Sequence, residues 1–234
     1  GGTFDVASGT TLTHNGAISG AGGLTKTGAG MLVLGSSANN YQGGTTINAG
    51  VLSIAADNRL GEAGDALAFG GGALRTTSTF TMTRAVTLNA GGGTLAPETA
   101  TTLTYNGVIG GTGGLTMDGG IGSILILGNA NSYQGGTSLR TGLLSVSADD
   151  RLGAASGTLT FMAGGGGGIL LTTATFTMSR ATTMDGIGGF EVAAGTTLTQ
   201  NGAIGGAGAL VKRGAGTLVL GGVNSHTGLF IVDA

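Results

Sequence analysis

The sequence predicts an all-β protein, wound as a parallel β-solenoid of about ten turns with no helices. Three observations lead to this fold class: an abundance of glycine with almost no charge, apolar residues spaced two apart, and a long internal repeat. The chain holds 53 Gly and one Pro among 234 residues, and it contains neither Cys nor Trp.

The composition excludes several other classes of protein. Only 9% of the residues are charged, far below the roughly 25% of an average soluble domain. Disorder is a poor interpretation because 40% of the residues are apolar, and collagen is excluded because the glycines follow no period of three. The net charge of −2, with scattered Lys and Arg, offers no basic stripe for phosphate groups, so we expect no nucleic-acid partner.

We find no targeting or anchoring segment within these residues, and we expect any native signal and anchor to lie outside them. No run approaches the ~18 apolar residues of a membrane-spanning helix, and no signal peptide opens the sequence. We therefore expect no membrane insertion by this segment. Because the chain begins Gly1-Gly2 without Met, we interpret it as a segment excised from a longer protein.

A long repeat runs through the sequence, and its first part recurs as residues 1–16, 92–107 and 189–202. The predicted organisation is one continuous solenoid over 1–234, with long units at 1–91, 92–187 and 188–234, the last of them truncated. Small differences in unit length fall at Gly-rich positions such as Gly164 to Gly168, which are predicted turns.

Within each unit the apolar residues are two apart, as in Leu32 and Leu34 or Phe80 and Met82, which indicates strands with one buried face. Asn-Gly and Gly-Gly pairs between the strands supply tight corners. An antiparallel sandwich with hairpins uses similar turns, but it does not require a tandem repeat, whereas a coil that buries each turn on the next one does. At roughly 20 to 25 residues per turn and ~4.8 Å between strands, the rod is about 50 Å long.

The solenoid interpretation predicts which side chains form the core. We expect the repeated Leu and Ile positions to point inward and the intervening Thr and Ser to face water. The predicted inward residues are Leu32, Leu34, Leu125, Leu127, Leu218 and Leu220, together with Ile18, Ile109 and Ile204.

The repeat resembles a known family. The string from Gly23 to Gly35, followed by Asn40 to Ile47, is similar to the autotransporter-associated β-strand repeat of type V secreted passengers. The second copy keeps Leu125 to Gly128 and Tyr133 to Thr137, whereas the third has His226 in place of Tyr and lacks the Gly-Gly-Thr. The resemblance implies a right-handed β-helix, export to the bacterial cell surface, and an outer-membrane barrel C-terminal to this segment. It implies no single activity and no functional residue.

Candidates for catalysis are few. His14 is replaced by Tyr105 and Gln200 in the other copies, and His226 by tyrosines, so we interpret both as exposed or corner positions. No Gly-x-Ser-x-Gly elbow accompanies them. The Gly-rich segments 70–72 and 164–168 are not followed by a Gly-Lys-Ser or Gly-Lys-Thr, so they predict no phosphate loop.

The carboxylates are equally sparse. Asp57 and Asp149 recur, each two residues before an arginine, Arg59 or Arg151, which predicts a turn cap or ion pair repeated with the fold. The pair Asp149-Asp150 offers too few oxygens for a Ca²⁺ site. Further carboxylates considered for a glycoside hydrolase are Glu62 with Asp65, in a Gly-rich loop expected to be a solvated turn, and the equivalent Asp5 and Glu191, which lie turns apart.

We therefore expect no enzyme and assign no catalytic, cofactor-binding or metal-binding residue, and no cofactor. The leading hypothesis is a stalk segment of a surface-displayed autotransporter passenger that supports adhesion or display. The alternative is a self-assembling extracellular filament subunit that stacks end to end through its open sheet edges. A carbohydrate-active β-helix enzyme ranks third. The expected contacts are self-association through the ends and host-surface or glycan contacts.

Overall fold

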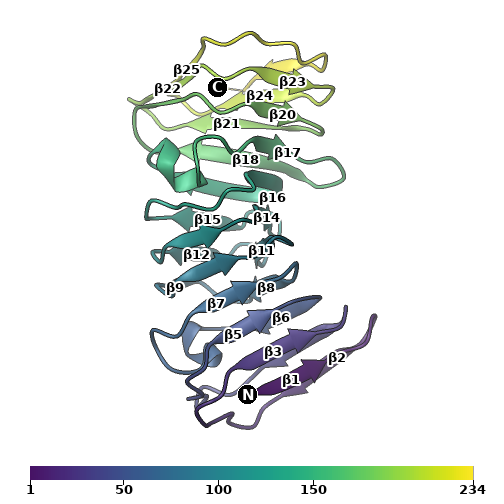
Figure 1. The fold of residues 1–234 in the computed structure, drawn as a ribbon. Helices are drawn as coiled ribbons and strands as arrows, with labels where there is room; N and C mark the ends of the chain where they lie inside the picture. Colours follow the sequence, from purple (N-terminus) through teal and green to yellow (C-terminus); the bar gives the residue numbers. More distant parts are fainter. Residues whose placement is uncertain (234) are drawn as a thin grey trace.

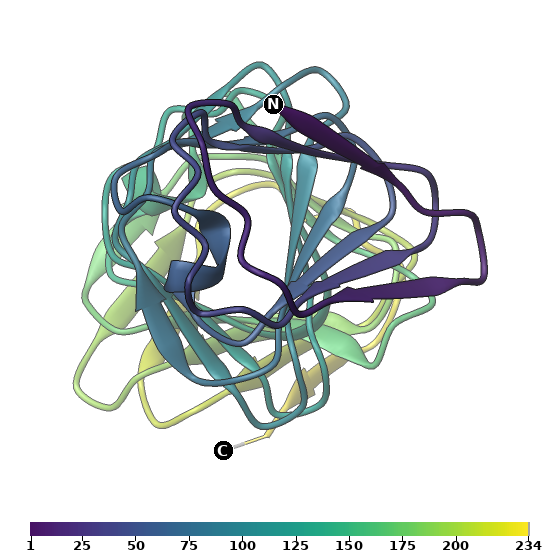
Figure 2. The same ribbon diagram turned by 90° about the horizontal axis from the view of Figure 1, so that it is seen from below.

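The computed structural model describes residues 1–233, which form a single rod of stacked coils running from the N-terminal end to the C-terminal end (Figure 1). All of the paired strands are parallel, and about ten turns follow one another, as predicted. In Figure 2, seen from the N-terminal end, the chain runs clockwise as it recedes, so the coil is right-handed.

Each turn has three faces, and the strands of one face pair from turn to turn. On the first face lie two sheets, with strands β1 (Gly2–Asp5), β3 (Leu24–Thr27), β5 (Thr45–Ile47), β7 (Leu67–Phe69), β10 (Val86–Leu88), β13 (Ile109–Gly111), and then β19 (Phe176–Met178), β22 (Thr197–Gln200) and β25 (Thr217–Leu220).

The second and third faces belong to one 17-stranded sheet because β16 (Thr137–Val146) turns the corner between them without a break. The second face otherwise contains β2 (Thr11–His14), β4 (Met31–Leu34), β6 (Val51–Ile54), β8 (Ala73–Thr76), β11 (Gly93–Pro97), β14 (Leu115–Asp118), β17 (Leu159–Phe161), β20 (Thr182–Met184) and β23 (Ile204–Gly206). The third contains β9 (Phe80–Met82), β12 (Thr102–Tyr105), β15 (Ile124–Leu127), β18 (Gly167–Thr172), β21 (Gly188–Val192), β24 (Leu210–Arg213) and β26 (Phe230–Val232).

The long sequence unit does not contain a whole number of turns. Its first strand is β1 in the first copy, β11 in the second and β21 in the third, and these three strands lie on the first, second and third faces respectively. Equivalent residues of successive copies therefore belong to different faces of the rod. The division of the chain at 91 and 187 remains a sequence-based prediction.

The inward positions form one core along the rod. Leu32, Leu34, Leu125 and Leu127 are buried as predicted, because side chains alternate between the two sides of a strand. Leu218, Leu220 and Ile18 also contact the core but stay partly exposed. These three belong to the first and last turns, which are covered from one side only, whereas Ile109 and Ile204 are fully buried.

The expectation that Thr and Ser face water is wrong for several corner positions. Thr76 and Thr172 are fully buried, and their hydroxyls have no hydrogen-bond partner among the described residues. Thr45 and Thr137 are also buried, and their hydroxyls share hydrogen bonds of 2.6 and 2.7 Å with Tyr41 and Tyr133. Threonine is close in size to valine and therefore fits these interior positions, and at Thr45 and Thr137 a tyrosine hydroxyl serves as its hydrogen-bond partner.

Two single-turn 3₁₀ helices interrupt the strands, η1 (Asp57–Leu60) and η2 (Asp149–Leu152), and the described residues contain no α-helix. Each occupies the same place in its copy. The C-capping glycine of η2, Gly153, has φ of +76°, and a Cβ on it would lie 2.6 Å from the Tyr133 carbonyl oxygen. No helix within residues 1–233 has the length and apolar character needed to cross a membrane.

Candidate functional site

Two hollows follow one another along a single edge of the rod, where the second face meets the third. The polar hollow is lined by Arg75, the segment 96–99 and the segment 118–120, and it has a volume of about 460 Å³. The apolar hollow begins at Ile121, the next residue of the chain, and extends toward the C-terminal end. The loop from Gly119 to Ser123 separates them.

Four charged side chains gather at the polar hollow. Arg75 Nη2 donates a hydrogen bond to Glu98 Oε1, and Arg140 Nη1, next to the hollow, lies 3.7 Å from Asp118 Oδ2. All four side chains remain between a third and a half exposed. Pairs that are this accessible are screened by water and contribute little to folding.

A β-bulge brings two of these charges together. The register between β14 and β16 runs from Met117 opposite Leu139 directly to Asp118 opposite Thr141, so Arg140 is the extra residue on β16. A bulge bends its strand and redirects the neighbouring side chains. Arg140 consequently lies beside Asp118, and the sheet edge opens over the segment 118–120.

The backbone at this corner departs from the repeat. Ala100 has φ of +57° and is the one described residue other than glycine with a positive φ. Its counterparts are Gly9 and Gly195, both at φ of +73°. A side chain in this conformation costs roughly 1 kcal/mol, so the second copy carries local strain beside the polar hollow.

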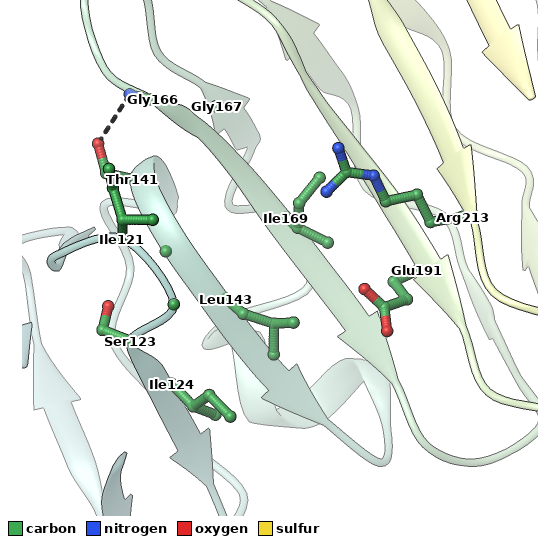
Figure 3. A pocket seen from close by; sticks show the side chains of 12 residues that line it. Ile121, Ser123, Ile124, Thr141, Leu143, Gly166, Gly167, Ile169, Glu191 and Arg213 are labelled. Atoms are coloured by element: carbon green, nitrogen blue, oxygen red, sulfur yellow. Dashed lines mark hydrogen bonds between the residues drawn. The ribbon is translucent and has the colours of Figure 1, made fainter. Parts of the chain in front are cut away.

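The apolar hollow is a row of aliphatic side chains on three adjacent strands. Figure 3 shows Ile124, Leu143 and Ile169 side by side, and these residues pair in register across β15, β16 and β18. Glu191 and Arg213 lie at the far end of the row. Glycines, including Gly142, Gly166 and Gly167, form part of its wall and leave open the space that side chains would fill.

The predicted ion pair of Asp57 exists, but its partner is Arg84 and not Arg59. Arg84 Nε lies 2.7 Å from Asp57 Oδ1, and the same guanidinium donates to the backbone carbonyls of Asp57, Leu60, Gly61, Glu62 and Asp65. Only 2% of the Arg84 side chain is exposed. Arg84 therefore binds the carbonyl groups of the whole loop that carries η1.

The second copy repeats this arrangement. Arg180 Nε lies 2.7 Å from Asp149 Oδ1, and the same guanidinium donates to five backbone carbonyls around η2. Arg151 Nε lies 3.6 Å from Oδ1 of the neighbouring Asp150. In the first copy, Nε and Nη1 of Arg59 have no hydrogen-bond partner among the described residues. Sequence proximity suggested the wrong arginine because the coil brings residue 84 back over residue 57 one turn later.

Of the two alternatives given for the histidine positions, exposed or corner, the exposed one is wrong. Tyr105 and Gln200, the counterparts of His14, are fully buried, and they donate to the backbone carbonyls of Arg84 and Arg180. Tyr41 and Tyr133, the counterparts of His226, are buried too. His14 is only partly buried because it lies in the first turn, where its ring packs against Phe4 at a centroid distance of 5.4 Å.

The remaining carboxylates are dispersed. Glu62 is exposed and Asp65 is partly exposed, as expected for a turn, although their backbone carbonyls serve Arg84. Asp5 is on the first strand and Glu191 on β21, close to opposite ends of the rod (Figure 1). Within residues 1–233 no three His, Asp or Glu side chains lie close enough together to hold a metal ion.

Burial changes the ionisation of several interior groups. Desolvation lowers the pKa of the Lys26 ammonium, and the negative charge of Asp5 partly opposes this shift. Lys26 Nζ donates to the carbonyls of Thr27 and Gly28 at 2.6 and 2.7 Å. Desolvation also raises the pKa of the phenol groups of Tyr41, Tyr105 and Tyr133. These groups lie inside the coil, where they complete the hydrogen bonding of corner carbonyls and hydroxyls.

Three segments of the chain match a known family of repeats. A family described as Passenger-associated-transport-repeat matches residues 24–54, 122–146 and 210–234, which begin at β3, just before β15 and at β24. Each match contains strands that pair with one another from one turn to the next. These three segments are thus passenger-associated repeats, as the resemblance implied.

One curated relative extends this assignment. The adhesin BmaC autotransporter of Brucella suis biovar 1 (strain 1330) is 47% identical over 103 residues, which is 44% of this chain and 3% of that protein. The chain therefore corresponds to a small part of a much longer relative. No solved structure matches the chain.

Proposed function

We propose that the chain is a stalk segment of a secreted, surface-displayed passenger, and that it supports adhesion or display. The observation that carries this proposal is the unbroken core: between Val6 and Leu210 each turn buries its apolar face on the next turn. A coil of this kind is stiff because every element contacts both neighbouring turns. The similarity to an adhesin autotransporter supports the adhesive context.

The charged groups considered for catalysis support a structural role. Asp57 and Asp149 pair with buried arginines, and their carboxylates stabilise the η1 and η2 loops. The family similarity favours a role without catalysis. We therefore assign the repeated ionic groups to the scaffold.

The stalk proposal is tested in the full-length protein on intact cells. Replacing the buried Leu144 and Leu170 by Asp puts charge into the core, and we expect loss of protease resistance, surface display and cell adhesion. The matched control replaces the outward neighbours Leu143 and Leu171 by Asp, which should leave display intact. Normal display and adhesion by the variant with Asp at positions 144 and 170 would contradict the stalk proposal.

A second candidate function is an end-to-end filament subunit, which requires an exposed apolar sheet edge in the isolated segment. Phe230, Ile231 and Val232 of β26 are between 40% and 64% exposed, and β26 pairs with β24 on one side only. An apolar strand with free backbone groups recruits further strands. Isolated chains that stay dispersed at high concentration in electron microscopy would exclude this candidate.

A further inference from the structure

We propose that the polar hollow binds a neutral saccharide unit of a glycan. This adds a ligand site on the side of the rod to the stalk role proposed above and does not depend on that role. The hollow lies at one edge of the coil, between β8, β11 and β14, and opens to solvent (Figure 1 shows these strands midway along the rod).

The charges of the hollow are not required by the coil. Arg75 corresponds to Leu171 in the next copy, and Glu98 corresponds to Ala7 and Ala193. Only 20 Lys, Arg, Asp and Glu residues occur in the chain, the sum of 9 basic and 11 acidic ones, yet four of them meet here across successive turns. Charge that departs from a structural repeat and gathers in one hollow indicates a role other than folding.

The balance of charge selects the class of ligand. Arg75 faces Glu98 and Arg140 faces Asp118, so two positive and two negative groups cancel. A phosphate, sulfate or sialic acid would meet two carboxylates, and a cation would meet two guanidinium groups. A neutral ligand avoids both repulsions.

The hollow also keeps hydrogen-bonding capacity free. The Arg75 guanidinium has five N–H groups, and the described hydrogen bonds of this group go to Glu98 and, at 3.8 Å, to the sulfur of Met31. The Asp118 carboxylate and the Thr99 hydroxyl accept no hydrogen bond from the rest of residues 1–233. Sugar hydroxyls donate and accept at once, so they match a site that offers guanidinium donors beside carboxylate acceptors.

The floor of the hollow suits a sugar ring. Ala96, Pro97, Gly119 and Gly120 present small apolar surface and exposed backbone between the charged groups. A Cβ on Gly120 would lie 2.3 Å from the backbone nitrogen of Thr99, so this position is restricted to glycine and the floor stays open. A volume of about 460 Å³ falls within the roughly 300–1,000 Å³ of typical small-molecule sites.

The test uses the whole chain on an array of neutral, sialylated and sulfated oligosaccharides. We expect binding to neutral glycans, with a Kd at least about tenfold weaker in the double variant Glu98→Gln, Asp118→Asn, because each substitution removes a charged acceptor. The matched control Asp185→Asn, Glu191→Gln removes two carboxylates outside the polar hollow and should bind like the wild type. Thermal unfolding of all three proteins establishes that the variants are folded.

Four results would overturn the proposal: no neutral glycan bound, equal binding by the Glu98 and Asp118 variant, equal loss in the control, or binding restricted to sialylated or sulfated glycans. A further arm presents a glycoprotein before and after enzymatic removal of its glycans. Capture that survives deglycosylation would identify a protein ligand and would also contradict the proposal. Loss of capture would support it.

Discussion

The role of each buried arginine depends on its contacts with the neighbouring turn of the coil. Arg84 and Arg180 each bind a carboxylate and a set of backbone carbonyls that water cannot reach. A guanidinium suits this position because its five donors spread in a plane, whereas an ammonium would serve fewer carbonyls. The η1 and η2 loops depend on these contacts, because the arginine donors satisfy the backbone carbonyls of each loop.

Replacing Arg84 by Met should destabilise the fold by about 3–5 kcal/mol, because Asp57 and several carbonyls lose their partner in a desolvated loop. The matched control is Arg59→Met, on the same loop, which should cost less than about 1 kcal/mol. Urea unfolding followed by circular dichroism measures both. Equal costs would mean that Arg84 does not hold the loop.

Lys26 predicts a pH dependence of stability. Its pKa is lowered in the folded chain, so the unfolded chain binds more protons and stability rises with pH up to the unfolded pKa of about 10.4. The variant Lys26→Met, which has the residue of the equivalent Met117, should lack this rise. The measurement is Tm from neutral pH to about pH 10. The buried tyrosines occur in both proteins, so their effect cancels, and parallel curves would contradict the prediction.

At the scale of elements, the corners between strands differ more from copy to copy than the strands do. The strands are short and alternate regularly, so their inward residues follow from spacing alone. Corners differ between copies: β16 runs through one without a break, and a bulge follows from it. The polar and apolar hollows both lie at this altered corner, which is why the repeat pattern did not reveal them.

The strained corner gives a stabilising substitution. Ala100→Gly should stabilise the fold by about 1 kcal/mol, because glycine adopts a φ of +57° without the clash of a Cβ. The control Ala193→Gly lies near the equivalent corner at a position without positive φ, and it should be destabilising by a few tenths to about 1 kcal/mol. Tm of both variants tests this; a loss of stability in Ala100→Gly would show that the Ala100 methyl contributes packing.

At the scale of the whole molecule, the two ends differ from the middle. The middle turns are covered on both sides, whereas β26 and the residues before it expose apolar side chains at the C-terminal end. This difference is a property of any solenoid whose sheets present free edges.

The exposed edge predicts association of the isolated chain. The double variant Phe230→Lys, Val232→Lys places charge on β26 and should keep the chain monomeric at concentrations where the wild type associates. The control Val223→Lys changes a more exposed apolar residue outside the strand and should behave like the wild type. Light scattering after size-exclusion chromatography reports the mass. A monomeric wild type would show that the end is protected.

The sequence by itself determined the class of fold, the number of turns and most of the core, because a spacing of two and a tandem repeat leave few other ways to bury Leu32 or Leu125. It also predicted a turn cap or an ion pair at Asp57. Only the tertiary structure decided that the partner is Arg84 and that Tyr105 and Gln200 are interior. It also decided that Arg75, Glu98 and Asp118 line one hollow, with Arg140 next to it. The reason is geometric: each of these contacts joins residues of different turns or crosses a bulge, and the register between turns is set by corner lengths that local sequence does not reveal.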